Sequence, residues 1–200
     1  MSRIAILFEN SDDQVTRVAH RMAELLRARG HSVHASDFRS LNETFSLRAF
    51  DGAILGCEGH RLAYPRELRH YARRNVAQLE RMPAWLFAVR ADAGGGDPPD
   101  AARQLKKLEA STGWWPQRVL WLGGLHSYTE AGPVARLLMR VRAALHGWFT
   151  RVANRYAPTD WHAVRQFAGD FEAALPAPPP PPPLLAPEEA VTLISPAVRV

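Results

Sequence analysis

The chain has 200 residues, 46% of them hydrophobic, which fits one globular domain and excludes an intrinsically disordered chain. No apolar run approaches the roughly 20 residues that span a bilayer, no secretory cleavage pattern follows the first residues, and one cysteine excludes an internal disulfide framework. The formal charge of +5 comes mostly from arginine and allows anionic partners. The sequence contains no nucleic-acid recognition motif. We therefore expect a cytoplasmic protein with no specific nucleic-acid partner.

Five short apolar runs alternate with helical patterns along the chain. The first run, Ile4 to Phe8, is continuously apolar and predicts a strand buried on both faces. A helical pattern follows it and stops at Gly30, a natural helix terminator. The remaining strands are predicted at residues 31–38, 50–57, 84–89 and 118–124.

Helical patterns fill most of the connections between these strands. The connection between the second and third strands is short and weakly helical, so we expect a reduced crossover helix there. Asp100 is expected to cap one helix and Thr159 the last one. The inner face of that last helix is predicted to comprise Trp161, Val164, Phe167, Phe171 and Leu175. Repeated strand and helix units predict an α/β domain with a parallel sheet.

The composition changes abruptly near the C-terminus, where consecutive prolines begin. We assign residues 1–175 to the α/β domain and residues 176–200 to a disordered proline-rich tail. Proline cannot continue a helix or a central strand, so the tail is expected to be extended. The alternative is a docking peptide for an aromatic-lined groove.

The order of these elements resembles a flavodoxin, and more specifically the menaquinone-dependent protoporphyrinogen dehydrogenases, a flavodoxin-like branch that uses FMN. The resemblance covers residues 3–175 and rests on "ILF" followed by "DDQ", "FDGAILG", "RMPAWLFAV", "WWPQRV" before "LGGL", and "TDWHAVRQFAGDF". It implies a three-layer sandwich whose five-stranded parallel sheet has the order 2-1-3-4-5. The ligand of such a fold lies where the strand order reverses. The implied activity is FMN-dependent oxidation of a porphyrinogen with a quinone as partner.

The segment from Glu9 to Val15 stands where the resembled family holds the flavin phosphate, between the first strand and a helix N-terminus. Backbone N–H groups and the helix dipole attract an anion at such a place, and hydroxyl side chains and a glycine complete the cradle. The resemblance assigns the phosphate contacts to Asn10, Ser11, Asp12, Asp13, Gln14 and Val15.

Several side chains of this segment depart from the family's pattern. Glu9 and Val15 stand at hydroxyl positions and Asp13 at the glycine position, whereas Asp12 and Gln14 match. Like charges about 4 Å apart repel by about 1 kcal/mol in water and by about 4 kcal/mol at an effective dielectric of about 20. Glu9 and Asp13 are therefore expected to weaken phosphate binding. Asp13 can adopt the left-handed backbone of a glycine better than most residues, which would preserve the shape of the loop; the alternative is that Asp12 and Asp13 cap the helix.

The flavin ring is expected against the loops that follow the third and fourth strands. Gly59 would let the backbone approach the ring, His60 or Arg61 would donate a hydrogen bond, and Tyr64 would stack on it. The alternative for Tyr64 is packing at the start of a helix. His126, after the fifth strand, is the candidate catalytic residue, because a histidine titrates near neutrality. The histidines form no metal-binding pattern, and Cys57 is expected to be a buried filler.

An arginine-rich helical pattern with a tryptophan occupies residues 133–152. A basic amphipathic helix is suited to peripheral contact with anionic lipid at the inner face of the membrane, and the alternative is an ordinary sheet-covering helix. Two functions therefore remain in view. One is an FMN-dependent oxidoreductase, and the other is a cofactor-free flavodoxin-like module that acts through protein or membrane-surface contacts.

Overall fold

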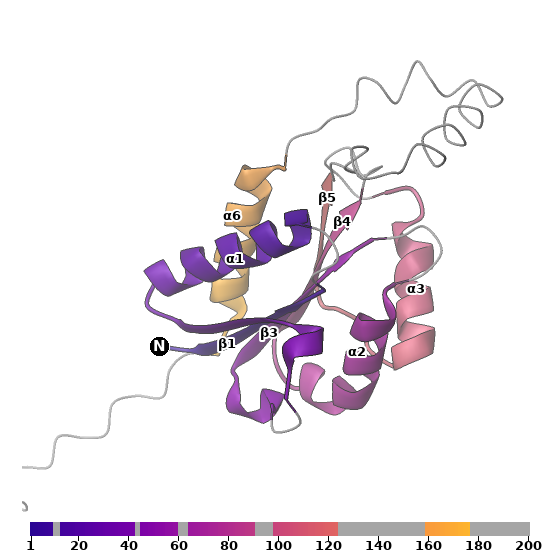
Figure 1. The fold of residues 1–200 in the computed structure, drawn as a ribbon, viewed down its shortest axis with the longest axis horizontal. Coiled ribbons are helices and arrows are strands. Elements are labelled where there is room, and N and C mark those ends of the chain that lie inside the picture. Colours follow the sequence, from indigo (N-terminus) through magenta and orange to yellow (C-terminus); the bar gives the residue numbers. More distant parts are fainter. Residues whose placement is uncertain (10–12, 43–44, 60–63, 91–97, 124–158, 177–200) are drawn as a thin grey trace, which may run out of the picture.

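The computed structural model describes residues 1–9, 13–42, 45–59, 64–90, 98–123 and 159–176, which form a parallel sheet between two layers of helices (Figure 1). The strands are β1 (Arg3–Phe8), β2 (Ser32–Asp37), β3 (Gly52–Glu58), β4 (Ala84–Arg90) and β5 (Val119–Gly123). Neighbouring strands pair in parallel in the order β2-β1-β3-β4-β5, which confirms the predicted topology.

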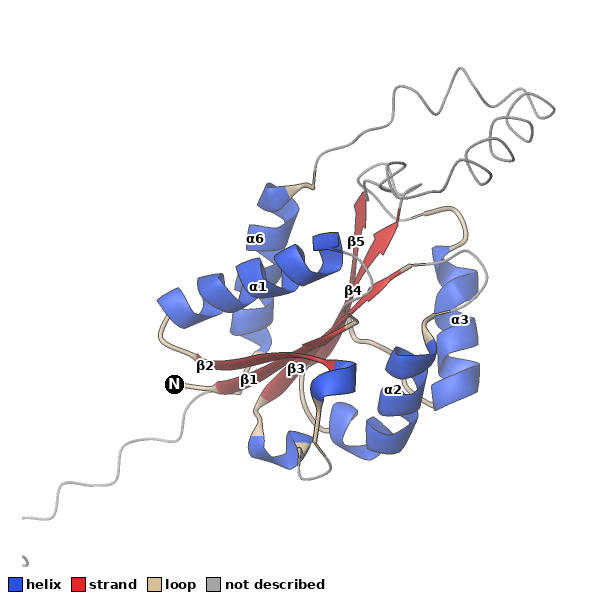
Figure 2. Ribbon diagram, viewed as in Figure 1, coloured by secondary structure: helices blue, strands red, loops and turns tan. Residues whose placement is uncertain are grey.

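The described helices cover both faces of the sheet. Figure 2 shows α1 (Asp13–Ala28) and α6 (Trp161–Ala174) on one face, with α2 (Arg66–Leu79) and α3 (Ala101–Thr112) on the other. Two short 3-10 turns, Phe38–Ser40 and Leu47–Ala49, stand between β2 and β3. They are the reduced crossover expected from the sequence. Within the described residues, no helix is both long enough and apolar enough to cross a membrane.

The three central strands β1, β3 and β4 are buried because their alternate side chains enter two separate hydrophobic clusters. In β4, Trp85, Phe87 and Val89 pack under α1 and α6, whereas Ala84 and its alternate neighbours face α2 and α3. Such continuous apolar runs are what a sheet covered on both faces requires. The sheet is therefore a rigid support for the loops that leave its ends.

The last helix begins one residue later than the sequence predicted. The carboxylate of Asp160 accepts hydrogen bonds from the backbone N–H groups of His162 and Ala163, each at 3.0 Å, so Asp160 and not Thr159 is the cap. Trp161 is 40% exposed and does not belong to the inner face. The reason is that the helix starts at Trp161 itself and its buried face begins one turn later, at Val164.

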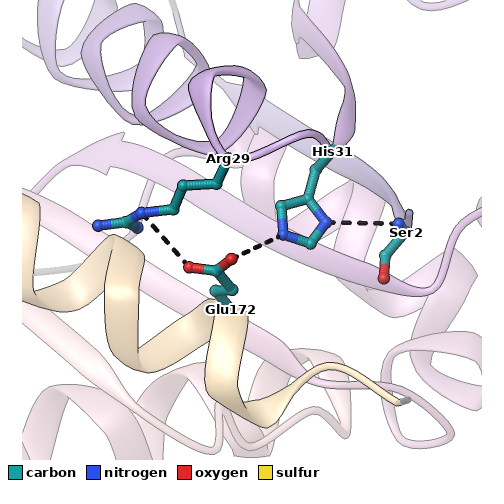
Figure 3. A network of polar contacts seen from close by, with 4 residues as sticks. All are labelled: Ser2, Arg29, His31 and Glu172. Carbon is teal, nitrogen blue, oxygen red and sulfur yellow. Dashed lines mark hydrogen bonds and ion pairs between the residues drawn. The ribbon is translucent and has the colours of Figure 1, made fainter. Parts of the chain in front are cut away.

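A polar network ties α6 to the opposite, amino end of the sheet (Figure 3). Glu172 on α6 forms an ion pair with Arg29, whose Nε lies 3.4 Å from its Oε2, and its Oε1 lies 3.1 Å from His31 Nε2. His31 Nδ1 in turn accepts from the backbone N–H of Ser2 at 3.4 Å. These contacts join α6 to the turn between α1 and β2, and so hold α6 across the face that α1 also covers.

Candidate functional site

The carboxyl end of the sheet is the place where the strand order reverses. From β1 the chain continues to β2 on one side, and from β3 it continues to β4 on the other. The loops that follow β1 and β3 therefore diverge, and in this class of fold ligands bind in the resulting crevice. The described residues at this edge include Glu9 after β1, Gly59 after β3, Arg90 at the end of β4 and Gly123 at the end of β5.

Glu9 extends β1 by one residue and buries its carboxylate. Its backbone N–H donates to the carbonyl of Gly56 at 3.0 Å, and the residue is 7% exposed. Because Phe8 packs under α1 and α6, the alternation of a strand turns Glu9 toward α2 and α3. A carboxylate thus lies inside the protein where the family's pattern has a hydroxyl.

Asp13 is the first residue of α1, and its side chain is exposed. None of the described residues other than glycine has a positive φ angle, so the expected left-handed backbone at Asp13 was wrong. The physical reason is that Asp13 already belongs to the right-handed helix. Its negative charge at a helix N-terminus stabilises that helix through the dipole. Capping by Asp12 stays a prediction, because Asp12 lies outside the described residues.

Gln14 is almost completely buried and serves a structural role. Its Nε2 donates to the carbonyl of Gly123 at 2.7 Å and to Thr159 Oγ1 at 2.8 Å. These bonds join the start of α1 to the end of β5 and to the residue before the cap of α6. Val15 is fully buried in the cluster under α1 and α6. Neither side chain is therefore turned toward a ligand at the loop.

The described side chains of the loop do not fit a phosphate group. Glu9 and Asp13 carry negative charge, and Gln14 and Val15 are engaged within the protein. The donors that a helix start ordinarily offers to an anion are the backbone N–H groups of its first turn, which here belong to α1. Asn10, Ser11 and Asp12, which were assigned to the same site, lie outside the described residues.

The backbone of Gly59 is in close contact with Arg90, which leaves no room for a side chain at this position. Its N–H donates to the carbonyl of Val89 at 2.8 Å, and a Cβ built on it would lie 2.3 Å from Arg90 Cγ. The stem of Arg90 thus covers the position at which a cofactor was expected to approach the backbone. Gly59 as a flavin contact stays a prediction, and His60 lies outside the described residues.

Arg90 was missed by the sequence analysis and is the most buried charged residue that the structure describes at this edge. It is 1% exposed, its Nη1 lies 2.9 Å from Asp100 Oδ1, and its guanidinium lies 5.7 Å from the centroid of the Trp121 ring. Asp100 Oδ2 also accepts from Gln104 Nε2 at 2.8 Å. Asp100 precedes α3 as predicted, but its carboxylate makes no capping bond to the backbone, because Arg90 and Gln104 occupy it.

The pKa of Asp100 shows how these contacts balance. Burial by itself raises the pKa of this carboxyl, but hydrogen bonds from Gln104 and Arg90 and the charge of Arg90 outweigh it and lower the pKa below its ordinary value. The ionised form of Asp100 is therefore favoured in the folded protein. We infer that the pair fixes the end of β4 to the start of α3.

Tyr64 is 4% exposed and packs in the cluster that α2 and α3 cover. Burial is the main cause that raises its pKa, and its hydroxyl has no hydrogen-bond partner among the described residues. Packing at the start of a helix is the interpretation that this geometry favours. Stacking of Tyr64 on a flavin ring stays a prediction.

Cys57 is fully buried, as the sequence predicted. Burial, followed by the charges of Glu9 and Glu58, raises its pKa well above the ordinary value. We predict that a disulfide reagent such as DTNB leaves the folded protein unlabelled at pH 8 and labels it stoichiometrically in guanidinium chloride, as followed by thiolate release. Rapid labelling of the folded protein would show that Cys57 is not enclosed.

Two further predictions fall on segments that the structure does not describe. His126, the candidate catalytic residue, and the basic pattern at 133–152 lie between β5 and α6, outside the described residues. The proline-rich tail lies there too, from residue 177 onward. In the described part of the chain, no group of three or more histidine, cysteine or acidic residues is arranged to hold a metal ion.

Comparison with known proteins agrees with this topology. A family model described as a flavodoxin domain matches residues 5–151. A protein of Leishmania major named protoporphyrinogen IX dehydrogenase [quinone] is 27% identical over 161 residues, which cover 80% of this chain and 68% of the relative. Oxidised flavodoxin 1 of Bacillus cereus superposes with a TM-score of 0.51 at 14% identity, covering 88% of this chain and 100% of its own. A flavodoxin of Streptococcus pneumonia TIGR4 gives 0.50 at 14% identity, covering 86% and 99%.

Proposed function

The chain belongs to the flavodoxin domain family, and from this premise we propose that it is a flavin-binding oxidoreductase of the protoporphyrinogen dehydrogenase type. The observation that supports this most is the start of α1 at the point where the strand order reverses. The relative from Leishmania major supports the choice of reaction class. A bound flavin would supply the electron transfer, and the protein would hold and orient it.

The described residues provide a rigid frame for such a ligand. Gln14 fixes the start of α1 against β5 and the residue before α6, and the Arg90–Asp100 pair fixes the end of β4 against α3. The loops that follow β1, β4 and β5 would surround a flavin, and these contacts fix one end of each of them. A porphyrinogen as electron donor, a quinone as acceptor and membrane contact through residues 133–152 are part of the same proposal.

The visible absorption spectrum of the purified protein, followed by flavin titrations watched by flavin fluorescence, tests the proposal. A yellow protein, or saturable quenching of added flavin, would support it and justify assays with quinones and porphyrinogens. A colourless protein that quenches neither riboflavin nor FMN would contradict it.

A second function is favoured by the side chains of the loop. Because Glu9 and Asp13 oppose a phosphate, the chain is also a candidate for a flavodoxin-like module without a cofactor, which acts through protein or membrane-surface contacts. Binding of the flavin-free protein to anionic vesicles, with no binding of any flavin, is the outcome that would select this second function.

A further inference from the structure

The two layers of helices that cover the sheet differ in charge. On one face, α2 and α3 contain seven basic and two acidic residues, a balance of +5 with histidine counted as neutral. On the other face, α1 and α6 contain four basic and four acidic residues, so their charges balance. The net positive charge of these four helices therefore lies on the side of the sheet that α2 and α3 cover (Figure 2).

Six of the seven basic residues on α2 and α3 are exposed. They are Arg66, Arg73, Arg74, Arg103, Lys106 and Lys107. The three on α2 recur after about two helical turns and the three on α3 after about one turn, so each set lies on one side of its helix. The two helices also pack against each other, and a Cβ built on Gly113 at the end of α3 would lie 3.7 Å from Val76 Cγ2 of α2. The six residues therefore form one surface, which we call the basic face.

The acidic residues of the two layers are paired differently. Glu67 on α2 pairs with Arg39 Nη2 at 3.1 Å, and Arg39 belongs to the 3-10 turn Phe38–Ser40, so this pair brings a further positive charge to the basic face. On the opposite layer, three of the four acidic residues pair with arginines: Arg21–Glu24 at 2.9 Å, Arg29–Glu172 at 3.4 Å and Arg118–Asp170 at 2.8 Å. Charge is thus offset locally over α1 and α6, whereas the basic face keeps an excess of positive charge.

We propose that the basic face binds the carboxylate-rich surface of a partner protein. Four of its six residues are arginines, whose planar guanidinium groups match the geometry of a carboxylate and form two parallel hydrogen bonds with it. Complementary charge of this kind steers the encounter of two proteins and suppresses wrong partners. The interaction requires no bound flavin, so it goes beyond the function proposed above.

Two features favour an acidic protein over a lipid surface or a nucleic acid. Helices that insert into a bilayer surface carry large apolar side chains on one side. The large hydrophobic residues that the described part of the chain exposes all lie outside α2 and α3, and they are Met1, Trp115 and Trp161. The major groove of a DNA duplex is about 12 Å wide and admits one helix, whereas the basic face spans two packed helices of about 10 Å diameter each. A broad polar face of this kind is suited to the polar surface of another protein.

Fluorescence anisotropy of a labelled poly-L-glutamate peptide, titrated with the full chain, tests the proposal. The triple variant Arg66→Gln, Arg73→Gln and Arg74→Gln should bind the peptide about 10-fold more weakly than the wild type at low salt, because it removes three exposed charges from the basic face. Raising the salt concentration from about 0.05 M to about 0.5 M shortens the Debye length severalfold, so the wild type should lose most of its affinity and the difference between the two proteins should vanish. A wild type that does not bind the peptide at low salt would overturn the proposal.

The matched control is the triple variant Arg21→Gln, Arg27→Gln and Arg165→Gln, which removes the same charge from exposed positions of α1 and α6. Its affinity should stay within about threefold of the wild type, and far-ultraviolet circular dichroism confirms that both variants are folded. Equal losses in the two variants would overturn the proposal, because net charge and not the basic face would explain binding. Vesicles that contain phosphatidylserine and a DNA duplex are titrated in parallel. If the first triple variant lost more affinity for either of these than for polyglutamate, the face would belong to lipid or nucleic acid and the proposal would be wrong.

Discussion

Asp100→Asn is expected to lower the free energy of unfolding by about 2 to 3 kcal/mol at pH 7. Arg90 is 1% exposed, and the substitution takes the negative charge of Asp100 away from this buried guanidinium. Removing one member of a fully buried pair costs about 3 to 5 kcal/mol, and we expect a smaller loss because about a third of the Asp100 side chain is exposed. Urea denaturation measures the change.

The same substitution should remove part of the acid sensitivity of the fold. The pKa of Asp100 is lower in the folded protein than its ordinary value. A lowered pKa contributes stability that is fully present above the unfolded pKa of about 3.9 and is lost as the pH falls through the folded pKa. The difference in stability between the wild type and Asp100→Asn should therefore shrink below about pH 4.

A double replacement separates the charge from the shape of this contact. Arg90→Met with Asp100→Leu removes both charges, and apolar replacement of a buried pair is often close to neutral, so the double variant should be more stable than Asp100→Asn. Glu24→Gln, which breaks an exposed pair with Arg21, should change stability by less than about 1 kcal/mol. If Asp100→Asn matched this control, the ion pair would not be what holds the end of β4.

The fold was predictable because hydrophobic patterning determined it. Short apolar runs such as the one from Ile4 to Phe8 are typical of strands covered on both faces, and the helical spacing between the runs indicates the helices that cover them. The cap of α6 was misplaced by one residue because Thr159 and Asp160 are both residue types that cap helices. Local propensity alone does not choose between adjacent candidates.

The sequence predicted where the site lies in the fold but not which contacts its side chains make. Sequence order located Glu9 and Asp13 at the loop, but it did not show that Gln14 bonds to residues more than a hundred positions away. Arg90 was missed because an arginine at the end of a strand is usually exposed, and only tertiary structure places Asp100 beside it. The sequence offers one signal for the position of Arg90, which is Gly59. A glycine at the end of a strand indicates that another group approaches the backbone closely there.

Restoring the family's residues at the loop is expected to recover phosphate binding. Glu9→Ser with Asp13→Gly removes two negative charges and returns a hydroxyl and a glycine to the positions where the family's pattern has them. If each charge weakens FMN binding by about tenfold, the double variant should bind FMN about 100-fold more tightly, provided the effects add. Titration by flavin fluorescence at low salt measures the gain.

Riboflavin is the internal control for this experiment, because a neutral ligand end feels little of the charge that the substitutions remove. Its affinity should change by less than about threefold, so a gain confined to FMN would show that electrostatics and not loop shape had changed. Asp13→Asn alone keeps the size of the side chain and should give part of the gain. A double variant with unchanged FMN affinity would mean that the buried carboxylate of Glu9 and the exposed one of Asp13 do not face the phosphate. The barrier would then lie elsewhere in the site, and the cofactor-free function would become the better account of this chain.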